Sequence, residues 1–584
     1  MLVPKRYVRF GISLLLLLGA VWLLEAFLRF QQQAFLSSPM SLVSITHRDN
    51  QADFDALKII DALKEQPQDR NLVISIGVMT CLYAGTFREL CPSSRKYGVG
   101  NPDSLLADKA ACKVIRKDLA RKRRFRFVGV SHYLFYETIS LSQAIEYLSG
   151  SAKPINALQD FNKDIPEHYD NTAAFHALNE RNIRNWTFVS DVDVIFGAGA
   201  VDPRSGWTLS SKFPLKLGST LKYVSLKRPA STVESEHNIR LHVGPQNTFK
   251  IVQLADLHFS VGDGRCRDEF PKHDECHADP KSTAFIEQAL DSEKPQLVVF
   301  TGDQIMGQEC FLDSTSALLK VVKPVIDRKI PYAMVWGNHD DEGSLDRWQL
   351  SKLAQSLPYS MFKIGEKDTN DNTFGVGNYV HHIYDENGDA LSALYFLDAH
   401  KYSPNTKAYP GYDWIKEEQW KFFDQYVDDF SEQGKSLSMA FFHIPLPEYL
   451  DFQSKSTSDS QNPIVGNAKE GITAPKYNSQ GLKTLSRLGV KVVTTGHDHC
   501  NDFCLLDDSI SPANEDKIWL CFGGAGGEGG YAGYGGTERR IRIFELDYTE
   551  RKIVSWKVLN SSPTIPFDRQ ILVSDGIPKT DSLA

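Results

Sequence analysis

Cysteine is scarce in this chain, which has nine cysteines among its 584 residues. So few cysteines exclude a small domain held together mainly by disulfide bonds. Because the number is odd, at least one cysteine has no disulfide partner within the chain. Disulfides involving Cys266, Cys276, Cys310, Cys500 or Cys504 fit an oxidising lumen, and buried thiols fit the cytosol equally well. A zinc site at Cys500 and Cys504 would need a second ligand pair, and none lies nearby in sequence.

An excess of positive charge is also missing. The chain has 65 Lys and Arg residues against 73 Asp and Glu residues, a net charge of −8, which excludes a generally nucleic-acid-binding surface. One segment, Lys113–Arg126, concentrates basic residues. It fits an import signal or a polyanion-binding patch, and it fits a solvated face as well. The glycine-rich stretch Gly523–Gly536 lacks the G-K-[ST] of a phosphate-binding loop, so we interpret it as a flexible loop near the rim of a site.

The N-terminus has an apolar run, FGISLLLLLGAVWLL, which basic residues precede and Glu25 follows. Its length lies between that of a signal peptide and the ~20 residues of a spanning helix. No small-x-small cleavage site follows, so we predict a cytoplasmic tail and uncleaved signal anchor over residues 1–39; a buried N-terminal helix is the alternative. Basic residues before the run predict a single-pass type II protein of the endomembrane system with a lumenal catalytic domain. The sequons at Asn185 and Asn560 agree with that topology, and a cytoplasmic location is the alternative.

Residues 40–245 are predicted to form an accessory, β-containing domain without recognisable chemistry. A short amphipathic helix is expected over residues 52–65, where apolar residues recur with a period near 3.6. Short strands are expected within residues 186–203 and 219–228.

Further along, five short apolar runs each end, within a residue or two, on Asp, Asn or His. Those residues are Asp256 and His258, then Asp303, then Asn338, His339 and Asp340, then His443, and finally His497 and His499. The runs are rich in β-branched and aromatic residues, which is typical of buried strands in a parallel sheet. Helices predicted between them, over Lys281–Glu293, Ser314–Arg328, Trp414–Val427 and Asn478–Leu488, indicate a layered α/β fold. We therefore expect the polar side chains to gather at the carboxyl edge of one sheet, where mixed oxygen and nitrogen ligands suit two divalent metals.

The ordered blocks D-x-H, G-D, G-N-H-D, H and G-H-x-H resemble the calcineurin-like metallophosphoesterase superfamily. HFSVGDGRCRDEF, LYFLDAHKYS, GYDWIKEEQWKFF and GHDHCNDFC are similar to one branch, the purple acid phosphatase 29-like proteins and the fungal dose-dependent cell-cycle regulator phosphatase. The resemblance implies a layered sandwich of two mixed sheets flanked by helices over residues 246–575, followed by a tail over residues 576–584. By analogy it also implies a regulatory role in the cell cycle.

The same resemblance implies a ligand set. One metal would be held by Asp256, His258 and His499, a second by Asn338, His443 and His497, and Asp303 would bridge the two. His339 resembles the general acid of the family, and Asp340 would fix its tautomer or, alternatively, cap a loop. The tyrosine that gives the purple enzymes their colour is replaced by Met306, so a colourless pair of Mn, Zn or Fe(II) type is expected.

The resemblance further implies a phosphatase that acts on phosphomonoesters, with phosphoproteins as one substrate class. A metal-bridging hydroxide would attack phosphorus, and His339 would protonate the leaving oxygen. One alternative is a membrane-associated phosphodiesterase for lipid-linked or nucleotide substrates. The other is a membrane-tethered scaffold without catalysis.

Overall fold

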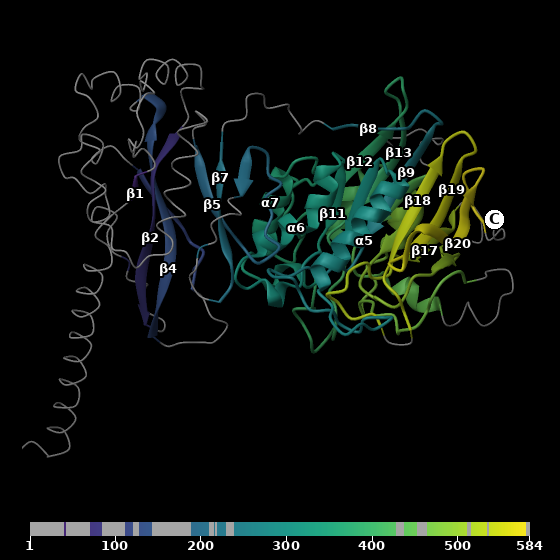
Figure 1. Cartoon of the computed structure of the whole chain (residues 1–584). Coiled ribbons are helices and arrows are strands. Elements are labelled where there is room, and N and C mark those ends of the chain that lie inside the picture. The colour runs from purple at the N-terminus through teal and green to yellow at the C-terminus, as the bar shows by residue number, and fades with distance from the viewer. Residues whose placement is uncertain are drawn as a thin grey trace, which may run out of the picture. The chain divides into compact units, whose positions relative to one another are not determined.

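The computed structural model describes the chain in segments, and most of residues 239–579 is among them (Figure 1). The described residues are 40–41, 71–84, 91, 111–120, 128–142, 189–209, 215, 219–228, 239–427, 437–452, 464–510, 516–533 and 536–579. Contacts divide the chain into two compact units. Unit 1 comprises Met1–Val194 and Thr208–Pro229, and unit 2 comprises Ile195–Trp207 and Ala230–Ala584.

The predicted signal anchor over residues 1–39 and the predicted helix over residues 52–65 lie outside the described residues. Among the helices that are described, none is both long and apolar enough to cross a membrane.

Unit 1 contains an antiparallel sheet in the order β1-β2-β4-β3. Its strands are β1 (Met40–Ser41), β2 (Asn71–Ala84), β3 (Ala111–Ile115) and β4 (Val128–Ser140). Side chains two apart along a strand point to the same face; Met79 and Cys81 of β2 and Tyr133 and Phe135 of β4 accordingly share one buried cluster. A three-stranded sheet follows in the order β5-β7-β6, formed by β5 (Asp191–Phe196), β6 (Trp207–Leu209) and β7 (Lys222–Lys227). The strands predicted within residues 186–203 and 219–228 are therefore present.

Unit 2 contains two mixed sheets of seven strands each. The first has the order β11-β10-β9-β18-β19-β20-β21, in which β9, β10 and β11 run parallel and the remaining pairs run antiparallel. Its strands are β9 (Thr248–Leu254), β10 (Leu297–Thr301), β11 (Tyr332–Val335), β18 (Arg540–Asp547), β19 (Lys552–Leu559), β20 (Ser562–Ser574) and β21 (Ile577–Pro578). Every residue of β10 and β11 is buried, because parallel strands are covered on both faces. β21 pairs with β20, so Ile577 and Pro578, which were predicted to lie in a C-terminal tail, belong to the sheet.

The second sheet has the order β16-β17-β15-β14-β13-β12-β8. Its strands are β8 (Leu241–His242), β12 (Tyr379–Tyr384), β13 (Ala390–Phe396), β14 (Ser438–Phe441), β15 (Val490–Thr495), β16 (Cys504–Asp507) and β17 (Ile518–Phe522). The central strands β13, β14, β15 and β17 run parallel to one another.

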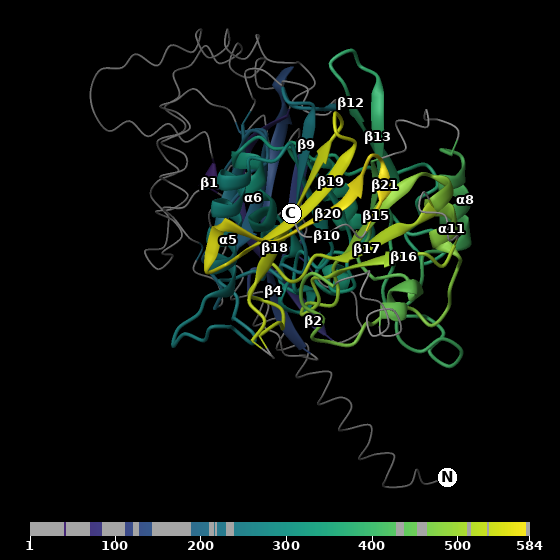
Figure 2. The ribbon, with the colours of Figure 1, turned by 90° about the vertical axis from the view of Figure 1, so that its right-hand side faces the viewer.

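Helices cover both outer faces of this sandwich. Figure 2 shows α5 (Ala278–Glu293) and α6 (Ser314–Asp327) on one side of the strands, with α8 (Glu417–Asp424) and α11 (Gly481–Arg487) on the other. Each of the four lies within a predicted helical segment or extends it by at most three residues. Short elements complete the fold, namely α7 (Arg347–Ser356), η4 (Gly307–Glu309), η5 (Asp340–Glu342) and η6 (Pro447–Asp451). The predicted α/β class with two mixed sheets flanked by helices is confirmed.

The strands that end on polar residues belong to both sheets, which corrects one expectation. β9, β10 and β11 lie in the first sheet, whereas β14 and β15 lie in the second. The polar residues meet because the two sheets present the carboxyl ends of these strands at the same end of the sandwich. The prediction of a site at the edge of a single sheet is wrong, since a strand pattern does not specify the sheet that the strand joins.

Candidate metal centre

The turns after these strands hold four of the expected ligands in an unusual backbone conformation. Asp256, His258, Asp303 and His497 have φ values of 53°, 51°, 51° and 77°. Residues other than glycine rarely adopt this left-handed region, which costs of order 1–3 kcal/mol each and occurs mainly at functional sites. The surrounding structure supports the strain, because the Asp256 N–H donates to Gly302 O at 3.1 Å and the His258 N–H donates to Asp303 O at 2.9 Å.

A first group of side chains brings Asp256, His258, Asp303 and His499 together. One ligand atom from each lies within 4.8 Å of the others, and all four residues are buried. His258 Nε2 lies 3.2 Å from His499 Nε2 and 3.7 Å from Asp303 Oδ2. His499 Nε2 lies 3.5 Å from Asp256 Oδ1.

A second group shares Asp303 with the first. His443 Nε2 lies 3.3 Å from Asp303 Oδ2, 3.1 Å from Asn338 Oδ1 and 3.2 Å from His497 Nδ1. The carboxylate of Asp303 therefore faces one histidine from each group. The structure brings all seven predicted ligands into these two groups.

Neighbouring backbone carbonyls orient the imidazoles. His443 Nδ1 donates to Thr301 O at 2.9 Å, and His499 Nδ1 donates to Tyr531 O. When one ring nitrogen carries the proton in this way, the other presents its lone pair to a metal. In both residues that second nitrogen, Nε2, points toward the carboxylates.

The chemistry of the donor set decides whether the two groups fit divalent cations. The ring nitrogens that face the other ligands are His258 Nε2 and His497 Nδ1. The second nitrogen of each ring, His258 Nδ1 and His497 Nε2, has no hydrogen-bond partner among the described residues. Mixed carboxylate, amide and imidazole donors suit Zn, Mn and Fe ions, so the residues present fit a dimetal centre.

The pKa shifts of the residues in the two groups also agree with metal binding. Burial lowers the pKa of His258 and His497 well below the ordinary value, so both imidazoles are neutral and can act as ligands. Burial opposes ionisation of Asp303, but His443 and other neighbouring imidazoles hold its pKa well below the usual range. Burial also lowers the pKa of His443, yet Asp303 outweighs this effect and raises it to about 9.

Close packing around the ligands requires glycine at two positions. Gly302 has a φ of 95°, and a Cβ atom there would lie 2.3 Å from His443 Nδ1. A Cβ atom on Gly530 would lie 2.5 Å from His258 Cδ2 and 2.6 Å from His499 Cε1. Any side chain at either site would displace a ligand ring.

His339 stands beside the cluster, and its orientation corrects one prediction. Its Nδ1 atom pairs with Glu342 Oε2 at 2.8 Å, and its side chain is 26 % exposed. Burial lowers its pKa, but Asp303 and Glu342 outweigh burial and raise it. The partner predicted for this ring was Asp340.

Asp340 instead caps the backbone beneath the site. Its carboxylate accepts N–H groups from Gly337 at 2.7 Å, Ile305 at 3.0 Å and Asp303 at 3.1 Å. The 3-10 turn η5 causes the difference, because it turns Asp340 inward and brings the residue three positions after His339 next to the ring. The alternative role of Asp340 as a loop cap is the one that the structure has.

Comparison with known proteins gives the same family as the site geometry. Residues 249–501 match the calcineurin-like phosphoesterase family model. Phosphatase DCR2 of Saccharomyces cerevisiae is 48 % identical over 530 residues, which cover 88 % of this chain and 89 % of the relative. The chain belongs to the calcineurin-like phosphoesterases.

Two further similarities cover more than half of the chain. "Probable inactive purple acid phosphatase 29" of Arabidopsis thaliana is 33 % identical over 366 residues, covering 58 % of this chain and 90 % of the relative. A solved dimetal phosphatase from Danio rerio is 15 % identical, with a TM-score of 0.38, and the match covers 56 % of this chain and 99 % of that one. Membership of the family agrees with the predicted enzyme class, a metal-dependent phosphoric ester hydrolase.

The glycine-rich stretch of this phosphoesterase differs from the flexible loop that was expected. Gly523–Gly530 is buried throughout. Its backbone also forms hydrogen bonds with the two segments that carry His258 and His499. The Gly526 N–H donates to Ala255 O at 2.9 Å, and the Ala525 N–H donates to His499 O at 3.1 Å. The stretch packs directly behind the ligands, and at Gly530 only glycine leaves room for the imidazole rings of His258 and His499.

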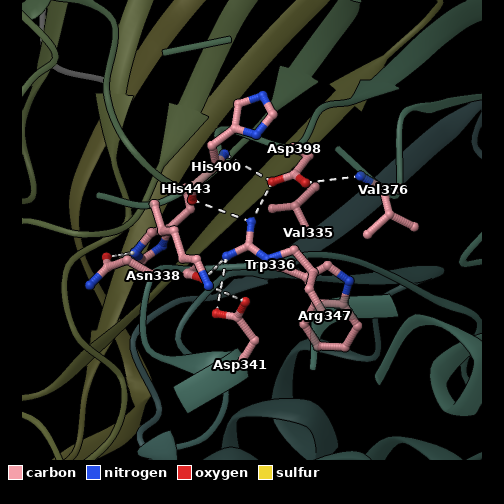
Figure 3. A network of polar contacts seen from close by, with 12 residues as sticks. Val335, Trp336, Asn338, Asp341, Arg347, Val376, Asp398, His400 and His443 are labelled. Carbon is pink, nitrogen blue, oxygen red and sulfur yellow. Dashed lines mark hydrogen bonds and ion pairs between the residues drawn. The ribbon is translucent and has the colours of Figure 1, made fainter. Parts of the chain in front are cut away.

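Sequence reasoning also missed a buried arginine behind the second ligand group. The guanidinium of Arg347 donates to Gly337 O, to Asp398 Oδ1 at 2.5 Å and to His400 O at 3.3 Å, and it lies 3.7 Å from Asp341 Oδ1 (Figure 3). It thereby connects the loop that carries Asn338 with the segment after β13. The sequence contained one signal for this contact, the block LYFLDAHKYS, because it includes Asp398 and His400, which accept the hydrogen bonds of Arg347.

Three disulfides are present among the described residues. They join Cys81 to Cys91, Cys266 to Cys276, and Cys504 to Cys521, while Cys310 is a buried thiol. The last pair lies directly opposite across the antiparallel strands β16 and β17. Because Cys504 is bonded to Cys521, the zinc site considered for Cys500 and Cys504 is excluded.

Proposed function

We propose that this protein is a binuclear metal-dependent phosphatase that hydrolyses phosphomonoesters, with phosphoproteins as a substrate class. The observation that carries the proposal is the shared carboxylate of Asp303, which lies 3.3 Å from His443 Nε2 and 3.7 Å from His258 Nε2. A carboxylate facing donors from two ligand groups is what a pair of cations needs, because their mutual repulsion must be neutralised.

In this proposal Asp256, His258 and His499 would hold one cation, Asn338, His443 and His497 would hold the other, and the carboxylate of Asp303 would neutralise both. When bound, such cations neutralise the phosphoryl oxygens and lower the pKa of coordinated water.

His339 is the proposed general acid. Glu342 accepts the Nδ1 proton at 2.8 Å, so Nε2 is the atom that carries the transferable proton. The His339 N–H also donates to Asp303 Oδ1 at 2.8 Å, which ties the acid to the ligand cluster. Partial exposure of the ring leaves Nε2 accessible to a leaving alkoxide. Glu342 favours the protonated ring, the form that a general acid requires.

The similarity to DCR2, which is named a phosphatase, supports catalysis. The name of the Arabidopsis relative describes that protein as probably inactive, so activity needs a direct test. This chain has the complete set of seven proposed ligands together with His339 and Glu342, which favours an active enzyme over a scaffold.

The test is hydrolysis of an aryl phosphomonoester and an aryl phosphodiester by the full chain, with Mn, Zn, Fe(II), Mg or chelator. We expect monoester turnover that chelator abolishes and one or more of the metals restores. Turnover of the diester alone would replace the proposal with a phosphodiesterase. No turnover of either ester by protein with two bound metals would contradict catalysis and favour the scaffold.

We also propose that residues 1–39 anchor the protein in the endomembrane system with the catalytic unit in the lumen. The three disulfides support this topology, because such bonds persist in oxidising compartments. In intact microsomes the catalytic unit should resist added protease; digestion without detergent would place it in the cytosol.

A further inference from the structure

Two tyrosines from one hairpin lie beside the second ligand group. The hairpin brings Tyr402 opposite Tyr412 in an antiparallel bridge, and its ends are closed by bonds from the Ser403 N–H to Gly411 O at 2.9 Å and from the Asp413 N–H to Lys401 O at 2.7 Å. The two tyrosine rings stack with centroids 5.3 Å apart. Tyr412 in turn packs edge-on against His497, with centroids 4.3 Å apart. The hairpin is therefore in direct contact with a proposed metal ligand.

The hydroxyl of Tyr402 lies near the side chains of Asn338 and Tyr412, both of which can donate toward its oxygen. Asn338 can donate to it because the other end of the amide, Oδ1, faces His443 Nε2 at 3.1 Å. A phenol oxygen that accepts two bonds still has its own O–H to donate. Tyr402 is 46 % exposed, so an acceptor arriving from solvent can reach that proton.

Two cationic side chains join the segment that precedes Tyr402 to the loop that carries Asn338. Arg347 donates both to Gly337 O, one residue before Asn338, and to Asp398 and His400, which precede Tyr402 (Figure 3). Lys401 donates to Asp341 Oδ2 at 2.6 Å, a second link between the same two loops. A donor fixed beside a metal ligand before substrate arrives costs little reorganisation during reaction.

We propose that Tyr402 is a substrate-contacting residue whose hydroxyl donates a hydrogen bond to a non-bridging phosphoryl oxygen of the phosphomonoester, with Arg347 as its positioning residue. This inference rests on the proposed phosphatase function and adds a residue that the five sequence blocks do not contain. The acceptor is a phosphoryl oxygen because negative charge spreads over the equatorial oxygens of phosphorus during transfer. Tyr402 is a neutral donor, so it orients that charge without competing for the metals.

The experiment compares Tyr402→Phe with the wild-type full chain, both loaded with metal. Loss of one such donor should lower kcat by roughly 10–100-fold, somewhat less than for a fully buried oxyanion donor. The decrease should be similar for aryl and alkyl monoesters, because the contact is to phosphorus oxygens and not to the leaving group. Orthophosphate, measured by isothermal titration calorimetry, should bind about tenfold more weakly.

Tyr409→Phe is the matched control, since it removes the same atom from the same hairpin. Within the described part of the chain, the ring of Tyr409 packs against Trp414 and Tyr477 and not against the ligands, so its variant should behave as wild type. Unchanged kcat and phosphate binding in Tyr402→Phe would overturn the inference. A decrease confined to alkyl esters would also overturn it, because Tyr402 would then protonate the leaving group. Loss of bound metal from Tyr402→Phe, by elemental analysis, would reduce Tyr402 to a structural role.

Phosphate binding separates this inference from the proposed function. If wild-type protein hydrolysed no ester but bound orthophosphate more tightly than Tyr402→Phe, the phosphatase proposal would fail and the phosphoryl contact would stand.

Discussion

Asp502 offers a sharp test of how the last ligand block is held. The residue lies three positions after His499, and its carboxylate is 0 % exposed. It accepts bonds from Arg540 Nη1 at 2.5 Å and from Lys557 Nζ at 2.8 Å. The backbone N–H and side-chain amide of Asn467 also donate to it, at 2.6 and 3.0 Å. One buried anion thus neutralises two buried cations on β18 and β19.

Asp502→Asn should destabilise the fold strongly. The amide has nearly the same shape, but it removes the charge and turns a donor toward either Arg540 or Lys557, both of which are at most 1 % exposed. Breaking a buried ion pair by removing one partner costs about 3–5 kcal/mol, because the remaining charge is left uncompensated. Arg540 loses its anionic partner and Lys557 keeps only the partly exposed Asp568, so we expect a loss of ~3–5 kcal/mol. Urea unfolding followed by tryptophan fluorescence measures this change.

Asp568→Asn is the control, because it removes another partner of the same lysine. Asp568 Oδ2 lies 2.7 Å from Lys557 Nζ, but its side chain is 32 % exposed. Solvent-exposed pairs contribute about 0–1 kcal/mol, and Lys557 keeps Asp502 in this variant. A loss below ~1 kcal/mol for Asp502→Asn, or equal losses for the two variants, would refute the reasoning.

The pH dependence of the same pair has a definite sign. Burial raises the pKa of Asp502, but Arg540 and Lys557 outweigh burial and hold it well below the usual range. A lowered pKa in the folded state gives stability that is present above the unfolded value, about 3.9, and is lost as the pH falls toward the folded value. The stability difference between wild type and Asp502→Asn should therefore be constant from about pH 5 to 8 and shrink below about pH 4. A difference that grew in acid would contradict this assignment.

Three further outcomes are expected. His339→Ala should retain both metals by elemental analysis yet lose ~10²–10⁴-fold in turnover of alkyl esters, and less for esters with good leaving groups; loss of metal would contradict its role as the acid. Asp303→Asn should lower the occupancy of both metal positions, because it removes the charge that they share, whereas loss of only one metal would show that the carboxylate is not bridging. Asn560 should remain unglycosylated even in a lumenal protein, since its Nδ2 donates to the buried Glu528 at 3.0 Å, and a glycan found there by mass spectrometry would disprove this.

Part of the site could be predicted because its residues are adjacent in sequence to strands. Blocks such as Asp256-x-His258 and His497-x-His499 follow apolar runs that form strands. The residues that directly follow a strand lie at one end of its sheet. The helices that became α5, α6, α8 and α11 could be predicted for a similar reason, because their pattern is local.

The hydrogen-bond partner of the His339 ring could not be predicted from the sequence. Asp340 is its neighbour in sequence, but the 3-10 turn directs that carboxylate to three backbone N–H groups and brings Glu342 to the ring. The pairing of Cys504 with Cys521 likewise depends on the register of β16 against β17. Such choices are set by turn geometry and strand register, which composition does not encode.

By itself, the amino-acid sequence determined the α/β class, the strand-end blocks that supply metal ligands and the negative overall charge. Tertiary structure alone decided that these blocks come from two sheets, that the glycine-rich stretch packs behind His258 and His499, and that Arg347 joins the loops of Asn338 and Tyr402. The physical reason is the separation in sequence over which each interaction acts. Periodicity and turn residues act over a few positions, whereas the metal centre is made by packing and polar contacts between segments more than a hundred residues apart, such as Thr301 and His443.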